Sequence, residues 1–207
     1  LTLSGVAVGE TAAADDFTFR NGITFHATQE DIMTLESLPF YGQNSSDDPP
    51  SIRFGGKIAG IDNSTITYYF DPSTKELCDV MFSFDDAGNN DPHTLNSYYE
   101  DILASVSQQY GEPLSQSDTG ARSVVGKAHE YHQETTMHLS SLLGIKDTVI
   151  NDEAWVLEYD GYNVKIDLFA YYYMRGSKIT SYSLEMGYRR YNAESTAAEP
   201  STIDSGL

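Results

Sequence analysis

The residues of this chain that could do chemistry gather first in a short histidine-rich stretch. Three of the five histidines lie there, at His129, His132 and His138, and Glu130 follows the first of them. On a helix His129 and His132 would share one face, and imidazole is a good zinc ligand. A zinc protease needs two residues between its glutamate and the second histidine, and only Tyr131 stands there. The spacing favours a solvated polar segment, so we expect no metal ligand here.

A second cluster of possible ligands is the acidic stretch at residues 85–91. It reads Asp-Asp-Ala-Gly-Asn-Asn-Asp, and oxygen atoms of this kind suit calcium. The alternating ligand spacing of an EF-hand is missing, and Asn96 stands where a bidentate glutamate is needed. We interpret the stretch as a turn-rich connection and predict no bound metal.

The single cysteine, Cys78, allows no intrachain disulfide. It lies in a strand-like pattern at residues 76–84, in which positions 78, 80, 82 and 84 are all apolar. This alternation places Cys78 on the buried face of a strand, where cysteine behaves as a small hydrophobic residue.

No enzyme motif with a defined mechanism is present. The sequence lacks Gly-x-Ser-x-Gly, a phosphate loop, a dinucleotide fingerprint and Cys-x-x-Cys. We therefore predict no catalytic residue and no cofactor, and a non-enzymatic binding protein is the leading interpretation. The alternative is a secreted hydrolase that acts on glycan or peptide through unrecognised carboxylates, since 31 acidic residues guarantee chance pairs.

Tyrosine is the remaining candidate for a functional surface. The chain has 15 tyrosines, several of them adjacent, at positions 68–69, 98–99 and 171–173. Neighbouring strand residues point to opposite faces, so one ring of each pair must face away from the core. We predict a binding face for a protein or glycan that includes Tyr69, Tyr171 and Tyr173. The alternative is that these rings cover the outer face of the sheet or pack under loops.

The charge of the chain narrows the class of partner. With 31 acidic and 12 basic residues, the net charge is −19. This charge argues against nucleic acid and against anionic lipid head groups. No stretch approaches the roughly 18 apolar residues of a membrane span. Residues 1–16 are small and acidic, as in a stalk that follows a removed signal peptide or lipid anchor, so we expect an extracellular or cell-surface protein.

Hydrophobic periodicity and turn residues predict the elements that position these groups. Thr28 and Asp31 form a capping-box pattern, and Ile32, Leu35 and Met33 follow as a short apolar helical face. A second helix is expected from apolar residues at three- and four-residue spacing. The expected segments are a loop at 42–50, strands at 52–61, 64–70 and 76–84, a polar loop at 85–96, a helix at 95–110, an insertion at 114–150, and strands at 154–159, 162–173 and 179–189.

Together these elements predict an α+β fold. We expect one domain at residues 17–191, with an antiparallel sheet built from two helix-then-β-meander units at 17–84 and 95–188. The helices should pack on one face, since either unit alone would expose edge strands and an open apolar face. Residues 192–207 have the composition of a disordered tail.

The layout resembles a group of secreted or lipoprotein-like proteins of Gram-positive gut bacteria. The resemblance rests on an Asn-Gly opening at 17–25, a short helix from Thr28, and the stretches 68–70, 80–84 and 98–113. This layout is also similar to the helix-plus-sheet units of β-lactamase-inhibitor-protein-like domains and of the small outer-membrane-assembly lipoprotein. The resemblance implies a protein-binding module at the cell envelope, without catalytic residues to transfer.

Overall fold

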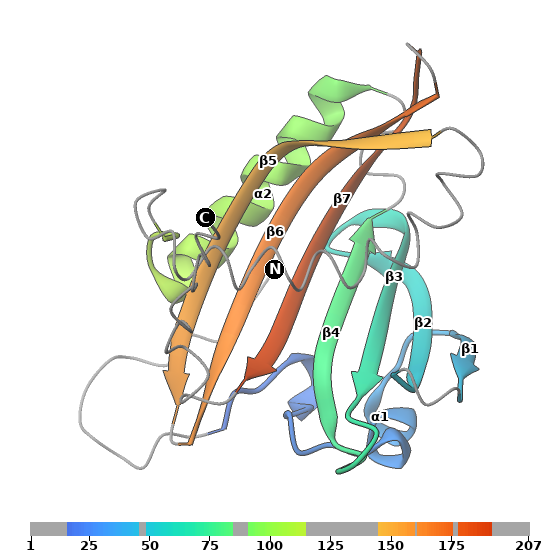
Figure 1. Cartoon of the computed structure of the whole chain (residues 1–207), viewed down its shortest axis with the longest axis vertical. Coiled ribbons are helices and arrows are strands. Elements are labelled where there is room, and N and C mark those ends of the chain that lie inside the picture. Colours follow the sequence, from blue (N-terminus) through green and yellow to red (C-terminus); the bar gives the residue numbers. More distant parts are fainter. Residues whose placement is uncertain are drawn as a thin grey trace, which may run out of the picture.

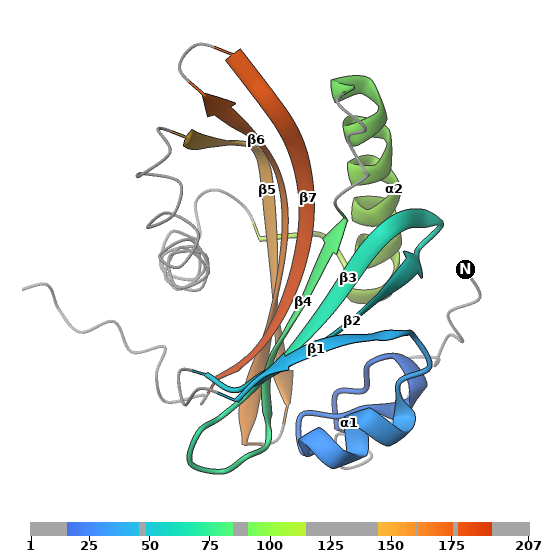
Figure 2. The ribbon, with the colours of Figure 1, turned by 90° about the vertical axis from the view of Figure 1, so that its right-hand side faces the viewer.

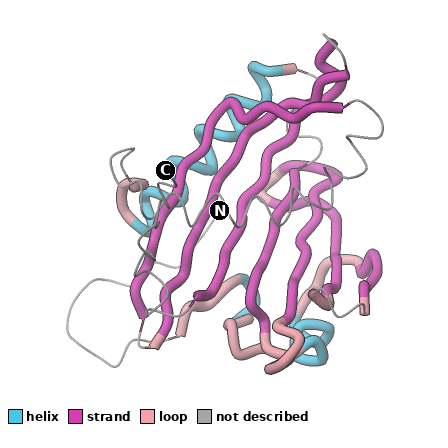
Figure 3. The backbone as a smooth tube through the Cα atoms, in the orientation of Figure 1, coloured by secondary structure: helices cyan, strands magenta, loops and turns pink. Residues whose placement is uncertain are grey.

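The computed structural model describes residues 16–45, 49–84, 91–114, 145–159, 161–175 and 178–191. This part of the chain forms seven strands, two α-helices and a short 3₁₀ turn (Figures 1 and 3). The elements are η1 (Arg20–Gly22), α1 (Gln29–Leu35), β1 (Phe40–Asn44), β2 (Ser51–Ile58), β3 (Ile61–Phe70), β4 (Leu77–Phe84), α2 (Pro92–Tyr110), β5 (Ile145–Tyr159), β6 (Tyr162–Arg175) and β7 (Lys178–Tyr191).

All seven strands form one antiparallel sheet in the order β1-β2-β3-β4-β7-β6-β5. The predicted antiparallel, sheet-rich fold is therefore confirmed. The β5–β6 hairpin closes at the pair Tyr159 and Tyr162, as predicted, and Gly161 takes a φ of +84° that suits glycine in a tight turn. Neither described helix is long and apolar enough to cross a membrane.

Four predicted boundaries are wrong. The expected strand at 52–61 runs through the turn between β2, which ends at Ile58, and β3, which begins at Ile61. Strand β1 lies mostly in the expected loop, because its polar residues at 42–44 pair with β2 although their composition is typical of a turn. Strand β5 begins at Ile145, inside the expected insertion, and runs as far as its long partner β6. Helix α2 begins at Pro92 within the expected polar loop, because Asp91 caps it by accepting the N–H groups of His93 and Thr94.

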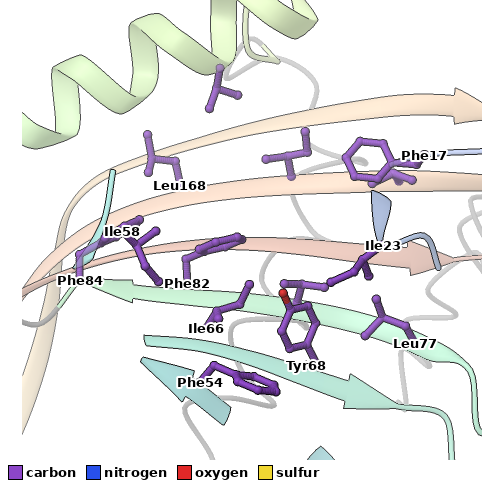
Figure 4. Close-up of a cluster of buried hydrophobic side chains, with 14 of the residues drawn as sticks. Phe17, Ile23, Phe54, Ile58, Ile66, Tyr68, Leu77, Phe82, Phe84 and Leu168 are labelled. Atoms are coloured by element: carbon purple, nitrogen blue, oxygen red, sulfur yellow. The ribbon is translucent and has the colours of Figure 1, made fainter. Parts of the chain in front are cut away.

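The main core lies between α2, the N-terminal segment and one face of the sheet (Figures 2 and 4). Helix α2 packs against β5, β6 and β7, and its buried residues are Leu95, Tyr99 and Val106. Trp155 of β5 is 2% exposed, and its indole N–H donates to the carbonyl of Gly111, 2.9 Å away, just after α2 ends. The helix is thus held against the sheet by apolar burial and by this hydrogen bond at its end.

Helix α1 is held by a buried carboxylate at its C-terminal end. The predicted capping box is confirmed, since the Thr28 hydroxyl accepts the N–H of Asp31 and the Asp31 carboxylate accepts the N–H of Thr28. Glu36, the residue after the helix, has a fully buried side chain. Its carboxylate accepts the N–H groups of Ser37 and Leu38 at 2.8 and 3.0 Å and the hydroxyl of Tyr68 at 2.8 Å.

This carboxylate joins three parts of the chain. Tyr68 belongs to β3 and is itself buried, and the Arg20 guanidinium lies 3.4 Å from the other side of Glu36. A buried carboxylate is tolerated only when charge-assisted hydrogen bonds satisfy it. Glu36 therefore fixes the end of α1, and the link into β1, relative to the sheet.

We expect Tyr68→Phe to lower the free energy of unfolding by about 1–3 kcal/mol, because it removes one donor from a buried carboxylate. Urea denaturation followed by circular dichroism measures the change. Tyr41→Phe, at a tyrosine that is 59% exposed, is the matched control and should change stability by less than about 0.5 kcal/mol. Equal midpoints for the two variants would contradict this role of Glu36.

Candidate interaction surface

The three tyrosines of the predicted binding face do not form one surface. Tyr69 of β3 is half-buried on the sheet face that points away from α2, which we call the second face. In the strand register Tyr69 is followed across the sheet by Asp79 of β4, Arg189 of β7 and Lys165 of β6. Three strand spacings, about 14 Å, therefore separate Tyr69 from Lys165. Tyr171 lies six residues further along β6, about 20 Å. The backbone of Tyr173 pairs with Ser181, and its side chain is outside the described residues.

The predicted exposure of Tyr171 is wrong. Alternation along β6 does place its ring on the second face, but the ring is 5% exposed. It packs there with Ala154 and Phe169 in a small apolar cluster that is separate from the main core. Every residue of β6 from 162 to 171 is buried, so this strand is covered on both faces. The period-2 rule gives the direction of a side chain, but it does not show whether that face is open to water.

Beside Tyr69, the second face carries four charged side chains, which we call the charge cluster: Asp79, Arg189, Lys165 and Asp167. Arg189 of β7 lies between Asp79 of β4 and Lys165 of β6 in the strand register. The Arg189 guanidinium binds Asp79 with N–O distances of 3.0 and 2.6 Å. The Lys165 Nζ lies 3.6 Å from the Asp167 carboxylate, and these two side chains are 1% and 6% exposed.

Burial decides the protonation behaviour of Lys165 and Asp167. Desolvation lowers the pKa of Lys165 and raises the pKa of Asp167, and the opposite charge of each partner counteracts part of both shifts. The Lys165 Nζ and one Asp167 oxygen have no hydrogen-bond partner. A group this buried is poorly placed to meet a substrate. Lys165 and Asp167 therefore form a buried ion pair in which each charge compensates the other, and they are not an exposed acid–base pair.

Cys78 is half-buried, where the alternation of β4 predicted a buried position. A register shift between Tyr69 and Phe70 brings Leu77 opposite Phe70, so Leu77 enters the core in place of Cys78. The thiol donates to the carbonyl of Tyr69, 3.4 Å away, and burial, with help from the charge of Asp79, raises its pKa to about 12. Such a thiol is a poor nucleophile.

The two possible metal sites of the sequence lie outside the described residues. His129, His132 and His138 fall in the stretch 115–144, and the acidic residues 85–90 precede Asp91. Within the described ranges, no group of three histidine, cysteine or acidic side chains is arranged to hold a metal ion.

The largest exposed apolar side chains lie elsewhere, at one edge of the sheet. Among described residues, five large apolar side chains are at least 40% exposed, and four of them fall within nine consecutive positions. These four, which we call the edge patch, are Met33 (44%), Leu35 (42%), Phe40 (47%) and Tyr41 (59%). The fifth is Ile179 of β7, at 40%. The edge patch therefore belongs to α1 and to the start of the edge strand β1. The ribbons of these two elements are labelled in Figure 2.

The expected apolar face of α1 is only partly correct. Ile32 is fully buried, but Met33 and Leu35 are exposed. Successive helix residues are about 100° apart, so Met33 and Leu35 fall on opposite flanks of the stripe that Ile32 buries. The helical geometry alone could have shown that the three residues cannot all face the core.

The rings of β1 are held in place on both faces of the sheet edge. The ring centroid of Phe40 lies 5.7 Å from that of the buried Phe54, nearly edge-on. The Tyr41 ring lies against Gly55 of β2 so closely that a Cβ atom there would overlap it. A bulge between Phe40 and Gly42 permits this arrangement. The two rings of the edge patch therefore lie on opposite faces of a short, bulged edge strand, and each is in contact with β2.

Comparisons with known protein families, with curated proteins and with solved structures find no match for this chain.

Removing one member of the buried pair should cost more than removing both. Lys165→Met or Asp167→Leu alone leaves an uncompensated buried charge, and we expect each to lower the free energy of unfolding by about 3–5 kcal/mol. The double variant should be more stable than either single variant. The Lys165→Met protein should also lose stability between about pH 5 and pH 8, since a carboxyl with a raised pKa stabilises the fold only while protonated. Denaturant titrations at both pH values measure this, and additive losses would contradict the pairing.

The thiol of Cys78 should react slowly in the folded protein. At about pH 8, a disulfide reagent should modify it a hundred-fold or more slowly than the thiol of the urea-unfolded chain, because the raised pKa leaves little thiolate. Stopped-flow or manual absorbance measurements give both rates. Equal rates would show that the thiol is not shielded.

Proposed function

We propose that this chain is a non-enzymatic interaction module of the bacterial cell envelope, and that it binds a protein partner through the edge patch. The observation that carries this proposal is the exposure of Met33, Leu35, Phe40 and Tyr41 within one short stretch of an ordered structure. Large aromatic side chains and methionine are enriched at protein interfaces. Grouped apolar exposure on a folded chain marks interaction surfaces more often than scattered exposure does.

We also propose that the fold consists of two helix-then-meander units that share one sheet. The strand order supports this, because β1 to β4 are contiguous, β7 to β5 are contiguous, and the two groups meet at the β4–β7 pair. The resemblance to protein-binding domains that the sequence suggests is part of the same proposal. Export and retention at the cell surface, supported by the acidic, small-residue stretch at 1–16, belong to the same proposal.

The alternative function, a hydrolase with unrecognised carboxylates, gains no support from the charge cluster. Asp167 has the raised pKa expected of a general acid. However, its side chain is 6% exposed and faces Lys165, and Asp79 is engaged by Arg189. Neither the Asp79 nor the Asp167 carboxylate is therefore available to act on a substrate.

A pull-down from bacterial envelope extract tests the proposal. We expect the variant Met33→Ser/Leu35→Ser/Tyr41→Ser to recover its main partner at least about ten-fold less than the unmodified chain, because it removes buried interface anchors. Ile179→Ser is the control, since it removes an exposed apolar side chain from a strand outside the edge patch.

In the same pull-down, Tyr69→Ala tests the second face, which carries the tyrosine that the sequence predicts to bind a partner. Because all of the mutated side chains except Tyr69 are about half exposed, thermal unfolding should confirm that the triple variant and the control remain folded. Equal recovery by the triple variant and the control would remove the edge patch from the proposal. A loss restricted to Tyr69→Ala would transfer the binding site to the second face.

A further inference from the structure

The charges around the edge patch restrict its partner. Residues 21–52 contain five acidic residues and neither lysine nor arginine. The two nearest described arginines have partners of their own. Arg20 lies against Glu36, and Arg53 donates to the Thr67 hydroxyl. Arg53 is exposed and keeps its charge, because a hydroxyl does not neutralise a guanidinium. Glu36 is buried, so the exposed acids described beside the edge patch are Glu30 and Asp31 of α1.

The acids of α1 stand next to its exposed apolar residues. Glu30 precedes Met33 by three positions and Asp31 precedes Leu35 by four, which are the spacings that place side chains side by side on a helix. Both acids are exposed, and hydrogen bonds from Thr28 lower the pKa of Asp31. Each exposed apolar side chain of α1 is thus flanked by a carboxylate.

Resting on the function proposed above, we propose that the edge patch binds a segment of a partner protein in which large apolar side chains are flanked by lysine or arginine. Apolar anchors would be covered by the patch, while the basic groups would meet Glu30 and Asp31 at its rim. The net charge of −19 would attract such a segment to the chain as a whole.

The same charges disfavour other occupants. A second copy of this chain would bring two acidic stretches together, with a net charge of −19 on each side. An anionic membrane would be repelled in the same way. Strand addition to β1 is disfavoured as well, because the strand has five residues and carries a bulge.

Three synthetic peptides of equal length test the partner class against the full chain. The first alternates leucine and lysine, the second alternates leucine and glutamate, and the third alternates serine and lysine. Fluorescence anisotropy of the labelled peptides measures binding. We expect the leucine–lysine peptide to bind at least ten-fold more tightly than the other two. Equal binding of the serine–lysine peptide would show a non-specific charge effect and overturn the proposal.

Charge reversal at one position locates the contact. Glu30→Lys should weaken the leucine–lysine peptide several-fold and strengthen the leucine–glutamate peptide, whereas Glu100→Lys on α2 is a control that should change neither specifically. Carbodiimide treatment of the complex should join the peptide to Glu30 or Asp31. Cross-links spread over many acids, or equal effects of the two reversals, would overturn the proposal.

The triple variant separates this inference from the proposed function. If Met33→Ser/Leu35→Ser/Tyr41→Ser loses its partner in the envelope pull-down while the peptides show no preference for basic residues, the interaction surface stands and the partner class is wrong. If the unmodified chain sediments as a dimer that this variant abolishes, the occupant is a second copy instead.

Discussion

The pairing of β4 with β7 is the constraint on which the rest of the structure depends. It joins residues 79–83 to residues 185–189, and its Asp79–Arg189 ion pair connects positions 110 residues apart. Tyr188, in the same stretch of β7, brings the rings of Phe17, Phe19 and Phe82 within 5.5 to 6.0 Å of its own. Without this junction, each half of the sheet would present an extra edge and leave part of its apolar face uncovered. The junction also places Asp79 beside Arg189, which the β6–β7 pairing sets next to Lys165, and the charge cluster results from the two pairings together.

The charges of two buried carboxylates, Glu36 and Asp167, are compensated in different ways in this fold. Glu36 accepts hydrogen bonds from two backbone N–H groups and one hydroxyl, and it holds α1 and β1 in a defined position. Asp167 has Lys165 nearby at 3.6 Å, but one of its oxygens has no partner. Charge-assisted hydrogen bonds offset the desolvation of the first carboxylate, whereas the second is compensated mainly by an opposite charge. Glu36 lies between α1 and β1, the two elements that carry the edge patch, and its hydrogen bonds position the link between them.

The proposed interaction surface follows from this arrangement. A seven-residue helix buries a narrow stripe, here centred on Ile32, and leaves Met33 and Leu35 on its flanks. The strand that follows is the edge of the sheet, so Phe40 and Tyr41 are covered on one side at most. Exposed apolar side chains next to Glu30 and Asp31 have the character of an interface with an acidic rim. The second face, in contrast, is buried along β6, where the sequence favoured an exposed tyrosine surface.

The sequence by itself determined the local features of this protein. The capping box at Thr28, the 95–110 helix, the Asp-Gly hairpin and the alternation of β6 depend on residues close together in the chain, and local rules describe them. Only the tertiary structure decided that Leu77 replaces Cys78 in the core, that Tyr171 is buried, and that Lys165 and Asp167 form a buried pair. Each of these outcomes depends on tertiary context: the extra residue of β4 opposite Tyr69 and Phe70 of β3, the packing of Tyr171 with Phe169 and with Ala154 of β5, and the position of β6 between β5 and β7. Alternation states which way a side chain points, whereas strand order and register, set by distant residues, decide what it meets there.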